Sequence, residues 1–415
     1  TSFTPLFGGV GYSVTITGTN FDGATASNNI VKINGVQTAT PTNISTTSLT
    51  VLVPKGAQGT GDITVTVGSN TASKGTFTEY ATVTTLAGDG TQGWSDATGL
   101  KAKFWSPAGL AIDNSGNLLV ADYGNNHVRS VTTSEGIVTT VAGDGSYGYQ
   151  DGNGTGAKLN EPWGITVNKT SGIAYVTDRG DNHIRTINLT SGAVGTYAGS
   201  TDGNDDGTDL TDVKFDQPRG LTFDAFDNLY VVDRWYSLIR EVVSAGYVIT
   251  IAGDNTSDYI NGNGTSSAFY FPDGIVIDPD GNNLYVADYT NNCIRKITIQ
   301  GSIDVSTFAG KAPGGSSSSN IDGTGTDARF SGPSGLAIDA NGNLYVADTN
   351  HNLIRKITPA GVVTTIAGQV DPGDAGYLDG LGPFTKIYQP VGIAVDADET
   401  IYVSDGTNRI RKIVP

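Results

Sequence analysis

Short apolar runs separated by turn residues dominate this chain, and the stretch from Gly335 to Ile357 shows the pattern most clearly. Residues 336–338 and 344–347 are apolar runs on either side of a turn segment, and a third run begins at Leu353. A fourth run covers residues 363–367 and is closed by Gly368. Runs of this length, bounded by Gly, Asn and Asp, predict four β-strands and no helix.

The same unit occurs six times, roughly every 55 to 60 residues, and is anchored by a proline, a glycine two residues later, an aspartate and an arginine. The anchor prolines are Pro107, Pro162, Pro218, Pro272, Pro333 and Pro390. The aspartates are Asp122, Asp178, Asp233, Asp288, Asp348 and Asp405, and the arginines are Arg129, Arg185, Arg240, Arg295, Arg355 and Arg411. Four short strands in each period are the pattern of a β-propeller blade.

The repeated strings P-x-G-[LI]-x-[VIF]-[DN], [LI]-[YL]-V-x-D and I-R-K-I, with an Ala-Gly end, resemble NHL repeats. The resemblance covers residues 83–415 and implies a six-bladed β-propeller. It does not imply one function, because NHL propellers serve as enzymes, RNA-binding proteins and protein scaffolds.

Residues 1–80 lie outside the repeat and carry apolar runs of their own at 14–17, 30–33, 49–53 and 63–67. The strings VTITGTNF, VKING, LTVLVP and GDITVTV resemble an IPT/TIG domain, which is a small immunoglobulin-like β-sandwich. We therefore expect an all-β chain, with this sandwich at residues 1–80 and a six-bladed NHL-type β-propeller at residues 83–415.

The repeat is incomplete at both ends of the predicted propeller. Residues 83–88, VTTLAG, match the end of a repeat whose earlier strands are missing, whereas the sixth repeat stops without its last strand. We expect strand 83–88 to complete the sixth blade and close the ring, because an open ring would expose unpaired strand edges.

The composition of the chain limits the classes of partner that it can bind and the cellular locations that it favours. The chain has 24 Lys and Arg against 41 Asp and Glu, and its net charge of -17 argues against nucleic-acid binding. The single cysteine, Cys293, excludes an intrachain disulfide, and no apolar run is long enough to insert into a membrane. The absence of methionine indicates a mature or trimmed chain, and richness in Thr, Ser, Asn and Gly with few Lys and Glu favours an extracellular β protein over a cytosolic enzyme.

Residues that recur in every repeat are interpreted as structural. The repeated Asp and Arg are expected to form hydrogen bonds at strand ends and between blades, and not to act in catalysis. His127 and His183 share a repeat position that other blades fill with Leu or Cys, which favours packing over zinc binding. The same interpretation applies to an Asp or Asn found eleven residues before most anchor prolines, and to the aromatic residues two positions ahead of it, Trp94, Tyr149, Tyr259 and Tyr377.

Positions that differ between repeats are the better candidates for function. Directly after the anchor proline and after the repeated aspartate, at the predicted top of the blades, repeats two to four concentrate Trp, Tyr and Arg. We predict a ligand site formed by Tyr123, Trp163, Arg179, Arg219, Arg234, Trp235, Asp273 and Tyr289. Aromatic faces stack on sugars and guanidinium groups bind carboxylates, so three arginines favour an anionic glycan. The alternative is that these arginines neutralise neighbours such as Asp178 and Asp233.

One loop, residues 202–212 with the sequence DGNDDGTDLTD, departs from the repeat. Asp202, Asn204 and Asp206 have the alternate spacing of a D-x-N-x-D-G calcium loop, and Asp209 and Asp212 are the candidates for further ligands. Val213 stands where a bidentate glutamate is usual. A calcium site and a solvated acidic loop therefore both stay open, and calcium is the one candidate cofactor.

An IPT/TIG domain followed by NHL repeats resembles the architecture of envelope proteins of glycan-degrading bacteria. Together with that resemblance, these observations predict a secreted or bacterial cell-surface protein whose propeller binds a carbohydrate, or another small extracellular ligand, at its top face. Two alternatives belong to other classes: a propeller lyase or lactonase with a divalent ion in the axial channel, and a structural or adhesive surface subunit. The IPT/TIG domain is the candidate contact for a protein partner.

Overall fold

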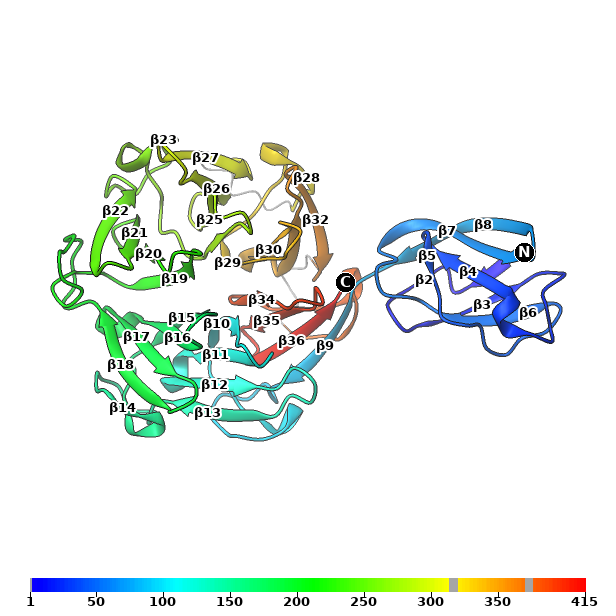
Figure 1. Ribbon diagram of the computed structural model, residues 1–415, viewed down its shortest axis with the longest axis horizontal. Helices are drawn as coiled ribbons and strands as arrows, with labels where there is room; N and C mark the ends of the chain where they lie inside the picture. Colours follow the sequence, from blue (N-terminus) through cyan, green and yellow to red (C-terminus); the bar gives the residue numbers. More distant parts are fainter. Residues whose placement is uncertain (1, 313–319, 370–375) are drawn as a thin grey trace. The chain divides into compact units, whose positions relative to one another are not determined.

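The repeats fold into six sheets set around a common centre in the computed structural model (Figure 1). The structure describes residues 2–312, 320–369 and 376–415. The chain divides into two compact units, one with residues Thr1–Thr84, Leu378–Thr385 and Ile413–Pro415 and the other with Thr85–Tyr377 and Lys386–Lys412. Over the described ranges, no helix is both long and apolar enough to cross a membrane.

The N-terminal unit contains two sheets, as the strand alternation predicts. The first has the order β1 (Ser2–Thr4), β3 (Ser13–Thr17), β6 (Ser48–Leu52). The second has the order β2 (Phe7–Gly8), β8 (Asn70–Glu79), β7 (Gly59–Val67), β4 (Asn29–Ile33), β5 (Val36–Gln37), and a 3-10 helix η1 (Ala26–Asn28) precedes β4. Alternate residues such as Val14, Ile16 and Phe77 are buried in one core, which gives the immunoglobulin-like sandwich.

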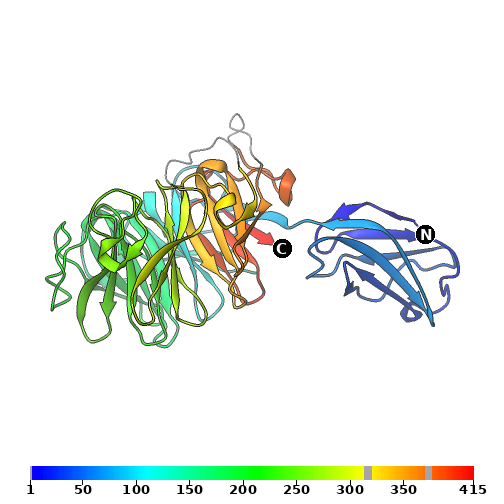
Figure 2. The same cartoon turned by 90° about the horizontal axis from the view of Figure 1, so that it is seen from above.

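Each sheet of the propeller has four main antiparallel strands, seen from the side in Figure 2. The first three blades are β10 (Pro107–Ile112), β11 (Leu118–Asp122), β12 (His127–Val131), β13 (Val138–Ala142); β15 (Pro162–Asn168), β16 (Ile173–Asp178), β17 (His183–Asn188), β18 (Ala193–Ala198); and β19 (Pro218–Phe223), β20 (Leu229–Asp233), β21 (Leu238–Val243), β22 (Tyr247–Ala252). The next two are β24 (Ile275–Ile277), β25 (Asn283–Asp288), β26 (Cys293–Thr298), β27 (Asp304–Ala309); and β29 (Pro333–Ile338), β30 (Leu344–Asp348), β31 (Leu353–Ile357), β32 (Val362–Ala367).

The sixth sheet draws on both ends of the propeller sequence. It contains β34 (Ile393–Val395), β35 (Ile401–Asp405) and β36 (Arg409–Val414), with β9 (Thr82–Ala87) next to β36. We propose residues 1–80 and 83–415 as the domain limits, with strand 83–88 closing the ring.

The anchor glycine of each P-x-G motif lets neighbouring blades approach closely at the axis. A Cβ on Gly164 would overlap the carbonyl oxygen of Arg219 in the next blade, and one on Gly392 would overlap that of Ala108. The second pair joins the sixth blade to the first. Glycine is therefore required by the contact between backbones, and its recurrence at the same repeat position follows from the ring.

A second ring of contacts joins the blades at the anchor prolines. The residue before each proline has a left-handed backbone, and its N–H donates to a side-chain oxygen of the preceding blade. The six pairs are Ser106 to Asn408, Glu161 to Asn126, Gln217 to Asn182, Phe271 to Ser237, Gly332 to Asn292 and Gln389 to Asn352. Left-handed residues before proline are strained, so these bonds fix their conformation and aim their side chains.

The long connections between blades run around the rim and join neighbouring outer strands. In the loop before blade 2, Gly143 N–H donates to the Gly154 carbonyl, and Gly154 N–H donates to that of Gly192. Four such loops add a short fifth strand to their sheets, namely β14 (Gly152–Asn153), β23 (Gly262–Asn263), β28 (Gly323–Thr324) and β33 (Gly380–Leu381). The 3-10 helices are η2 (Gly99–Lys101), η3 (Tyr123–Asn125), η4 (Gly154–Gly156), η5 (Arg179–Asp181), η6 (Gly264–Ser266), η7 (Gly325–Asp327), η8 (Thr349–His351) and η9 (Gly382–Phe384).

The repeated arginine is the hub of each blade. In blade 2, Arg185 is fully buried and donates to Asp178 Oδ2 at 2.9 Å, to Asp151 Oδ1 at 2.8 Å and to the Lys158 carbonyl at 3.0 Å. Asp151 is the loop residue eleven positions before the anchor proline, and Thr196 of the outer strand also donates to it. These bonds lie within one blade and its incoming loop, and not between blades as the sequence suggested.

Candidate functional site

Three variable positions of each blade meet at one end of the axial channel, which we call the top mouth. Pro162 pairs with Asp178 across β15 and β16, so the residues next to the anchor proline and the repeated aspartate lie at the same end of the blade. The structure adds the residue before the proline, whose backbone is fixed by the bond to the preceding blade. The predicted site residues of blades 2 to 4 gather around this mouth.

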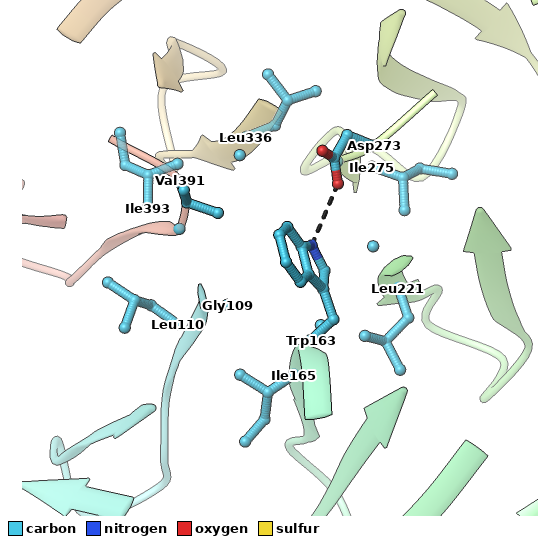
Figure 3. Close-up of a pocket in the computed structure, with 15 residues that line it drawn as sticks. Gly109, Leu110, Trp163, Ile165, Leu221, Asp273, Ile275, Leu336, Val391 and Ile393 are labelled. Atoms are coloured by element: carbon cyan, nitrogen blue, oxygen red, sulfur yellow. Dashed lines mark hydrogen bonds between the residues drawn. The ribbon is translucent and has the colours of Figure 1, made fainter. Parts of the chain in front are cut away.

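One buried carboxylate, Asp273, joins three predicted residues across the axis. The indole Nε1 of Trp163 donates to Asp273 Oδ1 at 3.2 Å, and Figure 3 shows the ring crossing the centre of the channel. Arg219 and Arg234 both donate from Nη1 to Asp273 Oδ2 at 3.1 Å. The guanidinium carbon of Arg219 lies 3.6 Å from the centroid of the Trp163 ring system. Trp163 and Asp273 thus close the top of the channel from opposite sides.

Arg219 is buried, but its guanidinium keeps its positive charge near neutral pH. Desolvation lowers the pKa of its guanidinium to about 10; the charges of Arg234 and Arg179 act in the same direction and Asp273 opposes them. The residue is therefore charged near neutral pH and depends on Asp273 for compensation. We expect Arg219→Ala to reduce stability as well as any binding, because it removes one partner of a buried ion pair.

A second group surrounds Arg179, at the end of β16. Its Nη1 donates to Glu161 Oε2 at 2.8 Å and to the Tyr123 hydroxyl at 3.0 Å, and its Nη2 donates to Gln217 Oε1 at 2.9 Å. Tyr123 in turn packs edge-on against Trp163, with ring centroids 5.3 Å apart. Arg179 is therefore held in place by groups from three blades.

An aromatic surface lies beside these polar groups. Trp235 packs on Phe271 with ring centroids 5.6 Å apart and is 53% exposed. The guanidinium of Arg234 lies over the rings of Phe271 and Tyr289, at 5.6 and 5.0 Å from their centroids. A partly exposed ring with a rigid neighbour is suited to stacking on the apolar face of a sugar.

The charges of the three mouth arginines are largely balanced within the protein. Their partners are Asp273 and Glu161, whereas Asp178 and Asp233 pair with the structural Arg185 and Arg240 at 2.9 Å. The alternative interpretation, in which these arginines are neutralised by neighbouring carboxylates, therefore describes the structure. The carboxylates that do so are Asp273 and Glu161, and not Asp178 and Asp233. Sequence reasoning missed Glu161, Gln217 and Phe271, although their fixed position before each proline was a signal available in the repeat.

Two of the predicted calcium ligands, Asp206 and Asp209, have other partners in the structure. Both oxygens of Asp206 are occupied, Oδ1 by Arg240 Nη2 at 2.8 Å and Oδ2 by Thr250 N–H at 3.0 Å. Asp209 accepts the Thr211 N–H at 2.9 Å. Asp206 thus has the same role as Asp151 in blade 2, and no group of three or more His, Cys, Asp or Glu among the described residues is arranged to hold a metal ion.

The calcium site on Asp202, Asn204, Asp206, Asp209 and Asp212 therefore stays a prediction. Calcium at a hundredfold excess over Kd would raise the free energy of unfolding by about 2.7 kcal/mol, because it binds the native state alone. Thermal melts in calcium and in chelator measure this difference, and equal melting temperatures contradict the site.

The histidines and loop aromatics pack against one another. Trp94 lies on His127 and Tyr149 on His183, with ring centroids 5.2 and 4.5 Å apart. His351 Nδ1 lies 2.9 Å from Asp348 Oδ2, where other blades place an asparagine such as Asn291. These contacts agree with the packing interpretation.

The axial channel has a hollow of about 70 Å³ next to Trp163 and a second one of about 250 Å³ farther along the inner strands. A hard divalent ion needs several oxygen ligands, but Asp273 is the one carboxylate among the six residues that follow the anchor prolines. Both of its oxygens already accept bonds from arginine. The donor set at the mouth does not fit a catalytic divalent ion.

Comparison with known proteins places the two units in families. Residues 1–80 match the IPT/TIG domain, residues 145–368 match the SMP-30/Gluconolactonase/LRE-like region, and residues 104–129 match the NHL repeat. The chain is 28% identical over 322 residues to Protein SUPPRESSOR OF QUENCHING 1, chloroplastic, of Arabidopsis thaliana, covering 74% of this chain and 30% of that protein. The chain thus spans less than half the length of such curated relatives.

Solved structures share the whole architecture. A protein of unknown function from Bacteroides thetaiotaomicron has a TM-score of 0.63 at 22% identity, covering 100% of this chain and 97% of that one. An auxiliary nutrient binding protein from the same organism has a TM-score of 0.63 at 19% identity, covering 99% and 96%. At these identities the similarity establishes the fold, an IPT/TIG domain followed by an NHL-type six-bladed propeller.

Proposed function

Because the chain belongs to the SMP-30/Gluconolactonase/LRE-like family and joins an IPT/TIG domain to an NHL-type propeller, we propose that it binds a carbohydrate at the top mouth. The observation that carries the proposal is the asymmetry of the mouth. Blades 2 to 4 supply an aromatic and charged network, whereas the fifth and sixth blades place Ser334 and Val391 after their prolines. The ring does not need this asymmetry to fold, so a ligand is its simplest cause.

The proposed compartment is the extracellular medium or the surface of a bacterial cell. Its support is the architecture shared with the auxiliary nutrient binding protein of Bacteroides thetaiotaomicron, together with the richness of the chain in Thr, Ser, Asn and Gly. Binding of a nutrient glycan would suit that location.

Trp235→Ala is expected to weaken glycan binding by about 1 to 3 kcal/mol, because it removes a stacking ring that folding does not bury. Glycan-array screening of the intact chain, followed by calorimetry with the glycan bound most tightly, measures the loss. Trp94→Ala is the matched control, since Trp94 is also exposed, at 58%, but lies in a rim loop. Equal affinities of both variants and the unmodified chain would place the ligand elsewhere.

A lactonase or lyase is the second candidate, and the match to the gluconolactonase family is the observation in its favour. Asp273 accepts hydrogen bonds from Arg219 and Arg234, so it is not placed to hold a divalent ion for a reaction at the axis. Lactone hydrolysis that is abolished by a chelator would establish the enzyme and reject a pure binding role.

A further inference from the structure

We infer that the sugar residue held at the top mouth is uncharged and lies beside the axis, in a polar pocket between blades 2 and 3. The inference rests on the proposed carbohydrate-binding function and adds the subsite and the class of sugar. The pocket encloses about 300 Å³ and is lined by Glu161, Arg179, Gly180, Asn182, Asp216 and Gln217.

At the top mouth, size favours the pocket over the part of the channel next to Trp163. The hollow of the axial channel next to Trp163 encloses about 70 Å³, and a second hollow of about 250 Å³ lies farther along the inner strands, away from the top mouth. The smaller hollow holds a few water molecules, whereas about 300 Å³ is at the lower end of pockets that hold small organic ligands. At the top mouth, a sugar ring therefore fits in the pocket and not in the channel next to Trp163.

The pocket offers both donors and acceptors to a ligand. Gln217 Oε1 is used by Arg179, which leaves the Nε2 donors of the same amide available. Asn182 uses Oδ1 for the Gln217 N–H and keeps its Nδ2 donors. Within the described part of the chain, no hydrogen bond reaches the carboxylate of Asp216. Sugar hydroxyl groups both donate and accept, so they match this mixed lining.

The charge of the pocket is unfavourable for an anion. Arg179 is its one cation, and it already donates to Glu161, Gln217 and Tyr123. Two carboxylates, Glu161 and Asp216, face this single positive charge. Burial and the negative charge of Asp202 raise the pKa of Asp216, and the positive charge of Arg179 opposes this shift. A uronate would bring a third carboxylate, so the geometry favours a neutral sugar over the anionic glycan expected from the sequence.

The lining is also fixed in place before a ligand arrives. Glu161 and Gln217 have φ values of 56° and 53°, and their N–H groups are held by Asn126 and Asn182 at 2.9 Å. Side chains on such fixed backbone positions lose little freedom when a ligand binds. The pocket is thus a preorganised site, in which Asn182 recurs in most repeats and residues such as Glu161, Asp216 and Gln217 vary between them.

Saturation-transfer NMR with methyl glucoside, methyl galactoside, methyl glucuronide and methyl galacturonide tests the inference on the intact chain. At least one neutral glycoside is expected to bind about tenfold more tightly than the uronide of the same configuration. Asp216→Asn should reduce that discrimination, because it removes the charge that repels the uronide. Gln217→Ala should weaken neutral binding about tenfold. Gln389→Ala, at the same left-handed position of the sixth blade, is the matched control and should bind normally.

The outcomes separate this inference from the proposed function. A uronide that binds as tightly as the neutral sugar, or a Gln217→Ala variant that binds normally, overturns the pocket assignment while glycan binding stands. Binding of none of the four glycosides also overturns it, and the glycan array then decides the proposed function independently. Methyl glucosaminide, which is cationic, is added as a fifth probe. Its preference over the neutral sugars would show that the two carboxylates select a cation, which contradicts the neutral class.

Discussion

Replacement of Arg295 by methionine is expected to destabilise the propeller by about 3 to 5 kcal/mol, the usual cost of removing one partner from a buried ion pair. Arg295 is fully buried and donates to Asp288 Oδ2 and Asn261 Oδ1, both at 2.8 Å, and to the carbonyl oxygens of Ala268 and Ile260. Methionine keeps much of the volume but leaves the Asp288 carboxylate buried without a cation. Chemical unfolding of the two chains, followed by tryptophan fluorescence, measures the difference.

A second variant separates the effect of the unpaired Asp288 charge from the effect of the packing lost with the Arg295 side chain. Asp288 also accepts the Tyr270 N–H and the Asn291 amide, so Asp288→Asn keeps an acceptor and removes the charge. The double variant Arg295→Met, Asp288→Asn should therefore be more stable than Arg295→Met alone. Arg329→Met is the control, because Arg329 donates to the exposed carbonyl oxygens of Thr326 and Asp327. Equal losses in the Arg295 and Arg329 variants would reject the hub role.

The fold was predictable because each repeat position has one physical task. The glycine of P-x-G is needed where a Cβ would meet the next blade, and the repeated Asp and Arg form a buried pair in every blade. Because the same residue type is required at the same position in all six blades, the repeat is visible in a single sequence. The family matches confirm the IPT/TIG domain and the propeller that this pattern predicted.

The partners of the site residues were not predictable in the same way. Trp163 and Asp273 are 110 positions apart and meet only because the ring brings blades 2 and 4 to one axis. The sequence therefore located Asp273 together with the mouth arginines, but it assigned their charge balance to Asp178 and Asp233 and missed Glu161. The roles of Glu161 and Gln217 depend on a left-handed backbone, which their residue types do not favour and which only the bond from the preceding blade explains.

The repeat also explains how such a site arises on a rigid frame. Bonds between neighbouring blades fix the backbone at the residue before each proline, and the side chain at that position is free to vary between blades. Blades 2 to 4 use this freedom for Glu161, Gln217 and Phe271. Variation confined to these positions would change the proposed ligand site without changing the contacts that close the ring.

In the N-terminal unit, Glu79 is expected to make stability fall as pH rises from about 4.5 to about 7. Glu79 lies two residues after the core residue Phe77 on β8, so its side chain shares the buried face of the sandwich. It is 4% exposed, and neither carboxylate oxygen has a hydrogen-bond partner. Burial therefore raises the pKa of Glu79 from 4.5 to about 7, because nothing compensates the charged form.

The sign of the effect follows from the two protonation states. Below pH 4.5 the carboxyl is protonated in both the folded and the unfolded chain, so folding has no ionisation cost. Between pH 4.5 and 7 the unfolded chain ionises and the folded one does not, and stability falls. Above pH 7 the loss is complete and amounts to about 3 kcal/mol.

Glu79→Gln removes this titration. Between pH 4 and pH 8, the free energy of unfolding of the variant should therefore rise by about 3 kcal/mol relative to that of the unmodified chain. Hydrogen exchange of the β7 and β8 amides, corrected for the intrinsic effect of pH on exchange, measures the opening free energy of this unit in the intact chain. Glu135→Gln, which removes an exposed carboxyl from the propeller, should not change the pH dependence of these amides. The same pH slope in the Glu79 variant and the unmodified chain would mean that this carboxyl is solvated or paired in solution. The buried face of β8 would then open to water at Glu79, next to the Phe77 core.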